Sequence, residues 1–88
     1  MDAKELYTSR KRDIAALLDW LSLEVDKAAE YAEKEGGPDY ADAGDLGHVR
    51  ELLIQTLSFL AQQEPEDIES ALDDVAAGRE QARGKTTD

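Results

Sequence analysis

The sequence contains no cysteine and no asparagine, and it has only two prolines and six glycines among 88 residues. The missing cysteine excludes disulfides, thiolate zinc sites and a cysteine nucleophile, and it fits an intracellular protein. No segment is apolar enough for a signal peptide or approaches the roughly 18 uninterrupted apolar residues of a membrane helix. We therefore expect a soluble, cytoplasmic protein that has no membrane partner.

Basic residues are also scarce, because 10 Lys and Arg stand against 21 Asp and Glu, for a net charge of −11. Residues 1–12 sum to +2 and residues 79–88 to +1, so residues 13–78 carry −14. Phosphate contacts need clustered bases, so we expect no nucleic-acid partner. The small basic patch of Arg10, Lys11 and Arg12 is better interpreted as a partner for the acidic body of a neighbouring subunit.

The first expected helix covers residues 3–35. Asp2 followed by Glu5 is typical of a capping box, and no glycine or proline interrupts the chain until Gly36. The apolar positions step by 4, 3, 4, 3 and 4, which is a heptad seam formed by Ile14, Leu18, Leu21, Val25, Ala28 and Ala32. Thr8 and Ser9 are the weakest point of this helix, and its continuity there is left open.

The second expected helix, residues 45–63, is the element around which the rest of the chain is organised. Its apolar residues cover about 220° of a helical wheel, so it must contact neighbours on more than one side. Asp45 is the expected N-cap. A short third helix is expected over residues 65–78, beginning at Pro65, and residues 84–88 are expected to be disordered.

Several apolar residues have no place in a simple packing of these helices. Trp20, Leu23 and Ala16 lie away from the heptad seam, and one helical neighbour cannot bury both sides. They are either partly exposed, as is common on small proteins, or part of a dimer contact. The candidate interface residues are Trp20, Leu23, Ala16, Tyr7, Leu52 and Phe59.

Three acids in the first loop, Asp39, Asp42 and Asp45, recur at every third position. They could gather a hard cation through oxygen ligands, but the spacing does not fit an EF-hand loop. A solvated acidic loop that ends in a helix cap explains them better, and we predict no metal site. The only histidine, His48, lacks the partners of a catalytic triad and is expected at the surface or in an interface.

Glu30 and Glu33, one helical turn apart, are similar to the paired carboxylates of the all-α, MazG-like nucleotide pyrophosphohydrolases. That resemblance covers residues 14–80 and implies a magnesium-dependent enzyme with an E-x-x-D on a following helix. The corresponding positions here are Glu51 and Ile54, so the aspartate is missing, and Pro65 interrupts the later E-x-x-D that ends at Asp67.

In size and composition the whole chain resembles the small acidic helical proteins of extremely halophilic archaea. Acidic excess keeps a protein hydrated at molar salt, where the Debye length falls to about 3 Å and charge repulsion is screened. The alternative is an ordinary acidic bacterial protein.

We predict an all-α protein with a single domain over residues 1–83. Its long first helix packs antiparallel on the central helix, and the short third helix closes one side. Because 88 residues form only a marginal core, we expect a homodimer to complete the fold. The predicted function is a non-enzymatic interaction or scaffolding module that has no catalytic residues or cofactor and that binds itself and one other protein. A degenerate MazG-like pyrophosphohydrolase is the alternative.

Overall fold

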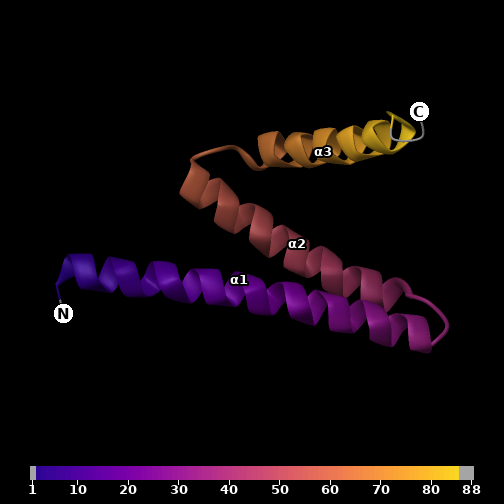
Figure 1. Ribbon diagram of the computed structural model, residues 1–88, viewed down its shortest axis with the longest axis horizontal. Helices are drawn as coiled ribbons and strands as arrows, with labels where there is room; N and C mark the ends of the chain where they lie inside the picture. Colours follow the sequence, from indigo (N-terminus) through magenta and orange to yellow (C-terminus); the bar gives the residue numbers. More distant parts are fainter. Residues whose placement is uncertain (1, 86–88) are drawn as a thin grey trace. The chain divides into compact units, whose positions relative to one another are not determined.

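A computed structural model describes the backbone of residues 2–85 and the side chains of residues 2–78. It contains three α-helices, α1 (Ala3–Lys34), α2 (Tyr40–Ala61) and α3 (Pro65–Lys85), and no strand in this part of the chain (Figure 1). The predicted all-α, three-helix class is confirmed. The residues group into two compact units, residues 1–46 and 47–88, with the boundary inside α2. The predicted single domain over residues 1–83 and its completion by dimerisation stay predictions.

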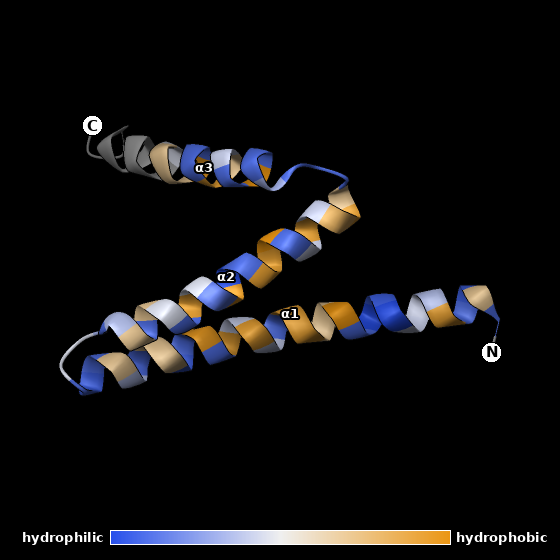
Figure 2. Cartoon of the chain, turned by 180° about the vertical axis from the view of Figure 1, so that it is seen from behind, coloured by the Kyte–Doolittle hydropathy of each residue, from blue (hydrophilic) through white to orange (hydrophobic). Residues whose placement is uncertain are grey.

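Helix α1 is continuous through Thr8 and Ser9. Asp2 is the N-cap, and its Oδ1 accepts a 2.8 Å hydrogen bond from the backbone N–H of Glu5. The Thr8 hydroxyl donates to the carbonyl oxygen of Lys4 at 3.0 Å, which satisfies the polar side chain without breaking the helix. A hydrophilic band separates the first turns of α1 from its apolar middle (Figure 2).

The turn after α1 is a Schellman motif built on glycine. The Gly37 N–H donates to the Ala32 carbonyl at 2.9 Å and the Gly36 N–H to the Glu33 carbonyl at 3.2 Å. Gly36 and Gly37 have φ angles of 100° and 105°, which glycine adopts without steric cost. The helix therefore ends where the Gly-Gly-Pro signal predicts.

Helix α2 begins at Tyr40, five residues before the predicted start, so Asp45 as N-cap is wrong. The cap is reciprocal: Asp39 Oδ1 accepts from the Asp42 N–H at 2.8 Å, and Asp42 Oδ2 accepts from the Asp39 N–H at 3.0 Å. This box starts the helix early enough to include Gly44 and Gly47, each of which costs about 1 kcal/mol relative to alanine. In the sequence these glycines favoured a loop, but the reciprocal cap stabilises the helix more than the glycines destabilise it.

The turn between α2 and α3 shares one hydrogen bond with the first turn, from a backbone N–H to the carbonyl five residues earlier. The Gln63 N–H donates to the Ser58 carbonyl at 3.2 Å, and the Ser58 hydroxyl donates to the Gln63 carbonyl. The left-handed position is occupied by Gln62, with φ 57°. Pro65 then opens α3, as predicted.

Helix α3 has 21 residues against 22 in α2, so the prediction of a short third helix ending at residue 78 is wrong. No proline follows Gly78, and the next residues, including Glu80, Gln81 and Ala82, are good helix formers that carry the helix onward. Residues 84–85 of the predicted tail belong to α3, and residues 86–88 lie outside the described residues.

Few side chains are buried in either unit. Among the side chains that the structure describes, Ala32 is the buried apolar residue of the first unit, and Ile54 and Ile68 are those of the second. Near these two isoleucines, Arg50 of α2 forms a 3.5 Å ion pair with Glu69 of α3, which joins the helices of the second unit. Within the part of the chain that the structure describes, no helix is long and apolar enough to cross a membrane.

Candidate functional site: an exposed apolar stripe on α1

One side of α1 packs on the first turns of α2. A small hollow within the first unit is lined by Ala28, Ala29 and Ala32 of α1 together with Asp42, Asp45 and Leu46 of α2. In this unit the end of α1 and the start of α2 run side by side in opposite directions, as predicted (Figure 1). The alanines leave room for the two backbones to approach closely, so this contact fixes which face of α1 is turned toward α2.

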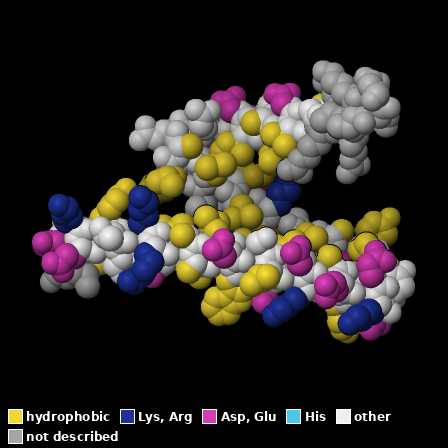
Figure 3. All heavy atoms as spheres, in the orientation of Figure 1, with side chains coloured by type: hydrophobic (Ala, Val, Ile, Leu, Met, Phe, Trp, Pro, Cys, Tyr) yellow, Lys and Arg dark blue, Asp and Glu magenta, His cyan; other side chains and the backbone are white. Residues whose placement is uncertain are grey.

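The opposite side of α1 carries an apolar stripe formed by Ala16, Trp20 and Leu23, which we call the Trp20 stripe. At 100° per residue its centre lies about 160° around the helix from the mean direction of Ala28, Ala29 and Ala32. Trp20 is 63 % exposed and Leu23 is 61 % exposed. In the space-filling view, apolar side chains protrude from both edges of α1 (Figure 3).

Trp20 is held by a short polar network on the same helix. Its indole Nε1 donates to Glu24 Oε2 at 3.3 Å, and Lys27 Nζ lies 3.2 Å from the same oxygen. The indole N–H therefore already has an acceptor, so the ring can be covered by a partner without burying an unpaired donor. The spacing of Trp20, Glu24 and Lys27 could have revealed this network, because residues three and four apart are neighbours on a helix.

The other predicted interface residues lie elsewhere. Tyr7 is exposed on the side of α1 that carries Ala32, not on the Trp20 stripe. Leu52 and Phe59 belong to the second unit, where Phe59 is 84 % exposed and Leu52 about half exposed. The six predicted interface residues are thus all accessible, but only Ala16, Trp20 and Leu23 form one continuous line.

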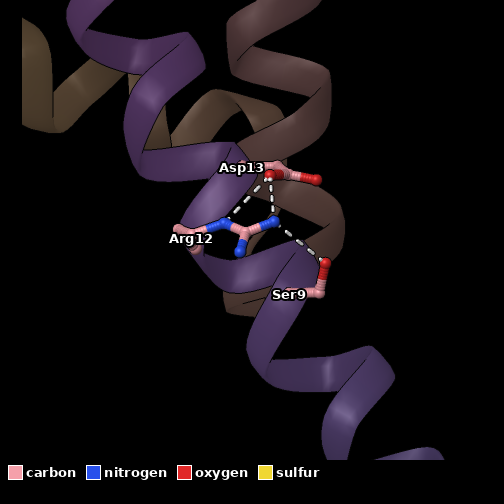
Figure 4. A network of polar contacts seen from close by, with 3 residues as sticks. All are labelled: Ser9, Arg12 and Asp13. Carbon is pink, nitrogen blue, oxygen red and sulfur yellow. Dashed lines mark hydrogen bonds and ion pairs between the residues drawn. The ribbon is translucent and has the colours of Figure 1, made fainter. Parts of the chain in front are cut away.

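The basic patch of α1 lies one to two turns before the stripe. Arg12 donates to Asp13 through Nε at 3.4 Å and Nη2 at 3.2 Å, and Nη2 also donates to the Ser9 hydroxyl at 3.2 Å (Figure 4). These groups are exposed, and exposed pairs contribute only about 0–1 kcal/mol. Among the described residues, Arg10 and Lys11 take part in no ion pair.

The acidic residues of the first loop act on the backbone. Asp39 caps α2. Its carboxyl accepts a hydrogen bond from the Asp42 backbone N–H, and this bond lowers the pKa of the Asp39 carboxyl below its ordinary value. Asp42 completes the reciprocal cap, and Asp45 lies in the second turn of α2. The sequence had placed all three acids in the loop before the helix; two of them are part of the helix.

The carboxylates of the MazG-like comparison do not form a centre. Glu30 and Glu33 are exposed on α1, Glu51 is exposed on α2, and Ile54, which stands where that family has aspartate, is only 3 % exposed. His48 is exposed as well. Among the described residues, no three His, Asp or Glu side chains lie close enough together to hold a metal ion.

No protein family, no curated protein and no solved structure matches this chain.

Proposed function

We propose that this chain is a non-enzymatic, self-associating helical module that forms a homodimer through the Trp20 stripe. The observation that carries the proposal is the exposure of Trp20 and Leu23 on the side of α1 that is turned away from the first turns of α2. Because α2 leaves the turn on the opposite side, its first turns cannot cover the stripe. A second chain can, and presenting this surface to another copy is the simplest use of it.

The energetic balance favours a weak, concentration-dependent dimer. Tyr31 is also exposed and lies toward one edge of the stripe, which gives three large apolar side chains per chain. Covering the exposed part of three such side chains on each of two chains is worth on the order of 10 kcal/mol. Association costs about 4–15 kcal/mol in lost translational and rotational freedom. Since the two quantities are similar, the charged residues beside the stripe influence the outcome.

The test is the molar mass of the protein by size exclusion with light scattering in molar salt. We expect a dimer for the native chain at micromolar concentration and a monomer for Trp20→Ala combined with Leu23→Ser. The matched control is Leu52→Ser with Phe59→Ser, which removes exposed apolar residues from the second unit. A native mass near 9.7 kDa would exclude the dimer. A monomeric control with a dimeric stripe variant would move the interface to α2.

We further propose that the module works in a salt-rich cytoplasm, as the halophilic composition suggests. The support is the charge of −14 on residues 13–78, which destabilises a compact state unless salt screens it. Thermal unfolding followed by circular dichroism, from about 0.1 M to molar KCl, tests this. We expect the melting temperature to rise with salt; a flat or falling trend would favour the ordinary acidic protein.

The degenerate pyrophosphohydrolase stays the lower-ranked proposal, because Ile54 supplies no ligand and is buried. We expect no pyrophosphate release when the protein is incubated with nucleoside triphosphates and magnesium or manganese. Turnover that disappears in Glu30→Gln with Glu33→Gln would reverse the ranking, because it would make those two carboxylates metal ligands.

A further inference from the structure

We infer that the first half of α1 docks an acidic amphipathic helix of another protein, through a side of α1 that we call the Lys11 face. The face consists of Tyr7, Ile14 and Leu18 together with Lys4, Arg10 and Lys11. It lies nearly opposite the Trp20 stripe on the helical wheel, so the proposed dimer leaves it accessible. The inference therefore goes beyond self-association and names the chemistry of a second partner.

The charges in the first half of α1 are sorted by side. On the helical wheel, the three bases of the Lys11 face lie within about 60° of the centre of its apolar line. The acids of residues 3–19, which are Glu5, Asp13 and Asp19, lie about 120° or more from that centre. Arg12 is on the acidic side, where it pairs with Asp13 at 3.2 Å. The Lys11 face thus carries bases and no acid.

The residues of the Lys11 face are exposed. Tyr7 is 70 % exposed, and Ile14 and Leu18 are about half exposed. The three bases are exposed too, and none of them takes part in an ion pair among the described residues. The alanine contact with the first turns of α2 begins at Ala28, ten residues or about 15 Å beyond Leu18. A neutral apolar partner would bury these cations without a counter-charge, whereas a partner with carboxylates would pair them.

The spacing of the Lys11 face fits a helical partner. Tyr7, Lys11, Ile14 and Leu18 step by 4, 3 and 4, which is the spacing at which side chains of one helix fit between those of another. The methylenes of Lys11 can pack along its apolar neighbours while the ammonium reaches the rim, where partner carboxylates accept it. Three bases are too few for a phosphate backbone, and the acids on the other side oppose binding to an anionic membrane.

Two synthetic helical peptides test the inference. Both have the same heptad line of leucine and isoleucine, and they carry either glutamate or lysine at the flanking positions. Each labelled peptide is titrated with the full-length protein near physiological salt, and binding is followed by fluorescence anisotropy. We expect the glutamate peptide to bind and Lys11→Glu to raise its Kd by about tenfold or more. Arg12→Glu is the matched control: it makes the same charge change at the next residue but on the other side of α1, so the Kd should stay within about twofold.

The lysine peptide separates the Lys11 face from the overall charge of the chain. With a net charge of −11, the protein attracts cations over much of its surface, so any binding of the lysine peptide should not weaken in Lys11→Glu. Lys11→Leu tests specificity, because it makes the central line of the face apolar throughout. This variant should bind a peptide with glutamine at the flanking positions more tightly than the native chain does. Circular dichroism of each variant verifies that α1 stays helical.

The outcomes separate this inference from the proposed function. Trp20→Ala with Leu23→Ser should bind the glutamate peptide as the native chain does, because these residues lie on the other side of α1. The inference is overturned if the glutamate peptide does not bind, or if Arg12→Glu weakens it as much as Lys11→Glu. Two further results would overturn it by assigning the Lys11 face to a different occupant. Binding to anionic lipid vesicles that depends on Lys11 would indicate a membrane surface, and loss of the dimer in Lys11→Glu would indicate a second copy of this chain.

Discussion

The two turns between helices share a hydrogen bond from a backbone N–H to the carbonyl five residues earlier, and they differ in the residue at the left-handed position. The first has Gly36 in the left-handed region, and the second has Gln62 there. Glycine reaches this conformation freely, whereas a residue with a Cβ does so at a cost of about 1–2 kcal/mol. The second turn therefore depends more on the contacts around it, including the Ser58 hydroxyl that donates to the Gln63 carbonyl.

The buried residues of the two units also differ, because their side chains are small in the first unit and larger in the second. The first unit is closed by Ala32, whose small side chain allows close approach of backbones, and the second by the larger Ile54 and Ile68. The first unit thus combines a glycine turn without strain with a small buried side chain. The second combines a strained turn with larger buried side chains. The first unit therefore relies on backbone geometry and the second on apolar burial.

The largest expected effect is the loss of burial in the second unit. Ile54→Ala should lower the free energy of unfolding by about 2–5 kcal/mol, because it removes the most buried side chain and leaves a cavity. Amide hydrogen exchange should then increase throughout α3 and change little in the first half of α1. Leu60→Ala, at an exposed position of the same helix, is the control and should change stability by less than about 0.5 kcal/mol. Equal losses in the two variants would contradict the assignment of Ile54 as the core.

The next effect comes from overfilling the first unit. Ala32→Leu should lower the free energy of unfolding by about 1–3 kcal/mol, because Ala32 is buried in the contact between α1 and the first turns of α2 and a larger side chain there pushes the two helices apart. Urea unfolding followed by circular dichroism measures the change. Ala29→Leu, at an exposed position on the rim of the same hollow, should cost less. If Ala32→Leu is stabilising instead, close approach is not what holds this unit together.

The sequence predicted the three helices and the residues that end α1, because those features depend on local signals: Asp2 as a cap, the Gly36 and Gly37 pair, and Pro65 at the start of α3. It did not predict where α2 begins. Asp39 and Asp45 are both good caps, and the reciprocal bond with Asp42 that decides between them is a three-dimensional relation. The extension of α3 past Gly78 was missed because a single glycine was given more weight than the helix formers that follow it.

The candidate site was predicted in part. Helical periodicity alone showed that Trp20 and Leu23 lie off the heptad seam, and both are exposed. Periodicity could not show that most of the seam itself stays uncovered: Ile14 and Leu18 remain about half exposed, because the alanine contact reaches only the last turns of α1. How far a neighbouring helix covers an apolar seam depends on packing between elements, which a heptad pattern does not record.

Substitutions at the left-handed positions of the two turns should change the free energy of unfolding in opposite directions. Gly36→Ala should lower the free energy of unfolding by about 1 kcal/mol, because φ 100° is unfavourable for any residue with a Cβ. Gln62→Gly should raise it by about 0.5 kcal/mol, since it removes strain at φ 57° and loses only chain entropy in return. Both are read from urea unfolding. The control is Gly44→Ala inside α2, where the added methyl meets open space and should stabilise the helix. A destabilising Gln62→Gly would show that the second turn is not strained.

The smallest expected effect is a pH dependence of the cap that begins α2 in the first unit. Helix α2 is capped by the Asp39 carboxylate. At the start of α3, the Asp67 and Ile68 N–H groups donate to the Glu64 backbone carbonyl, which does not titrate. The backbone N–H of Asp42 lowers the folded-state pKa of Asp39, so the charged cap stabilises the fold above the ordinary aspartate pKa. That contribution is lost as the pH falls below about 4 and through the lowered value.

Asp39→Asn keeps an oxygen acceptor without a titrating group, so the variant should lose less stability than the native chain between neutral and acidic pH. The comparison is made by urea unfolding at both pH values, with Asp45→Asn as the control, because Asp45 lies inside the helix and accepts no capping bond. Identical acid responses in the native and Asp39→Asn chains would mean that the carboxylate charge contributes nothing to the cap, and that the early start of α2 rests on the hydrogen-bond geometry alone.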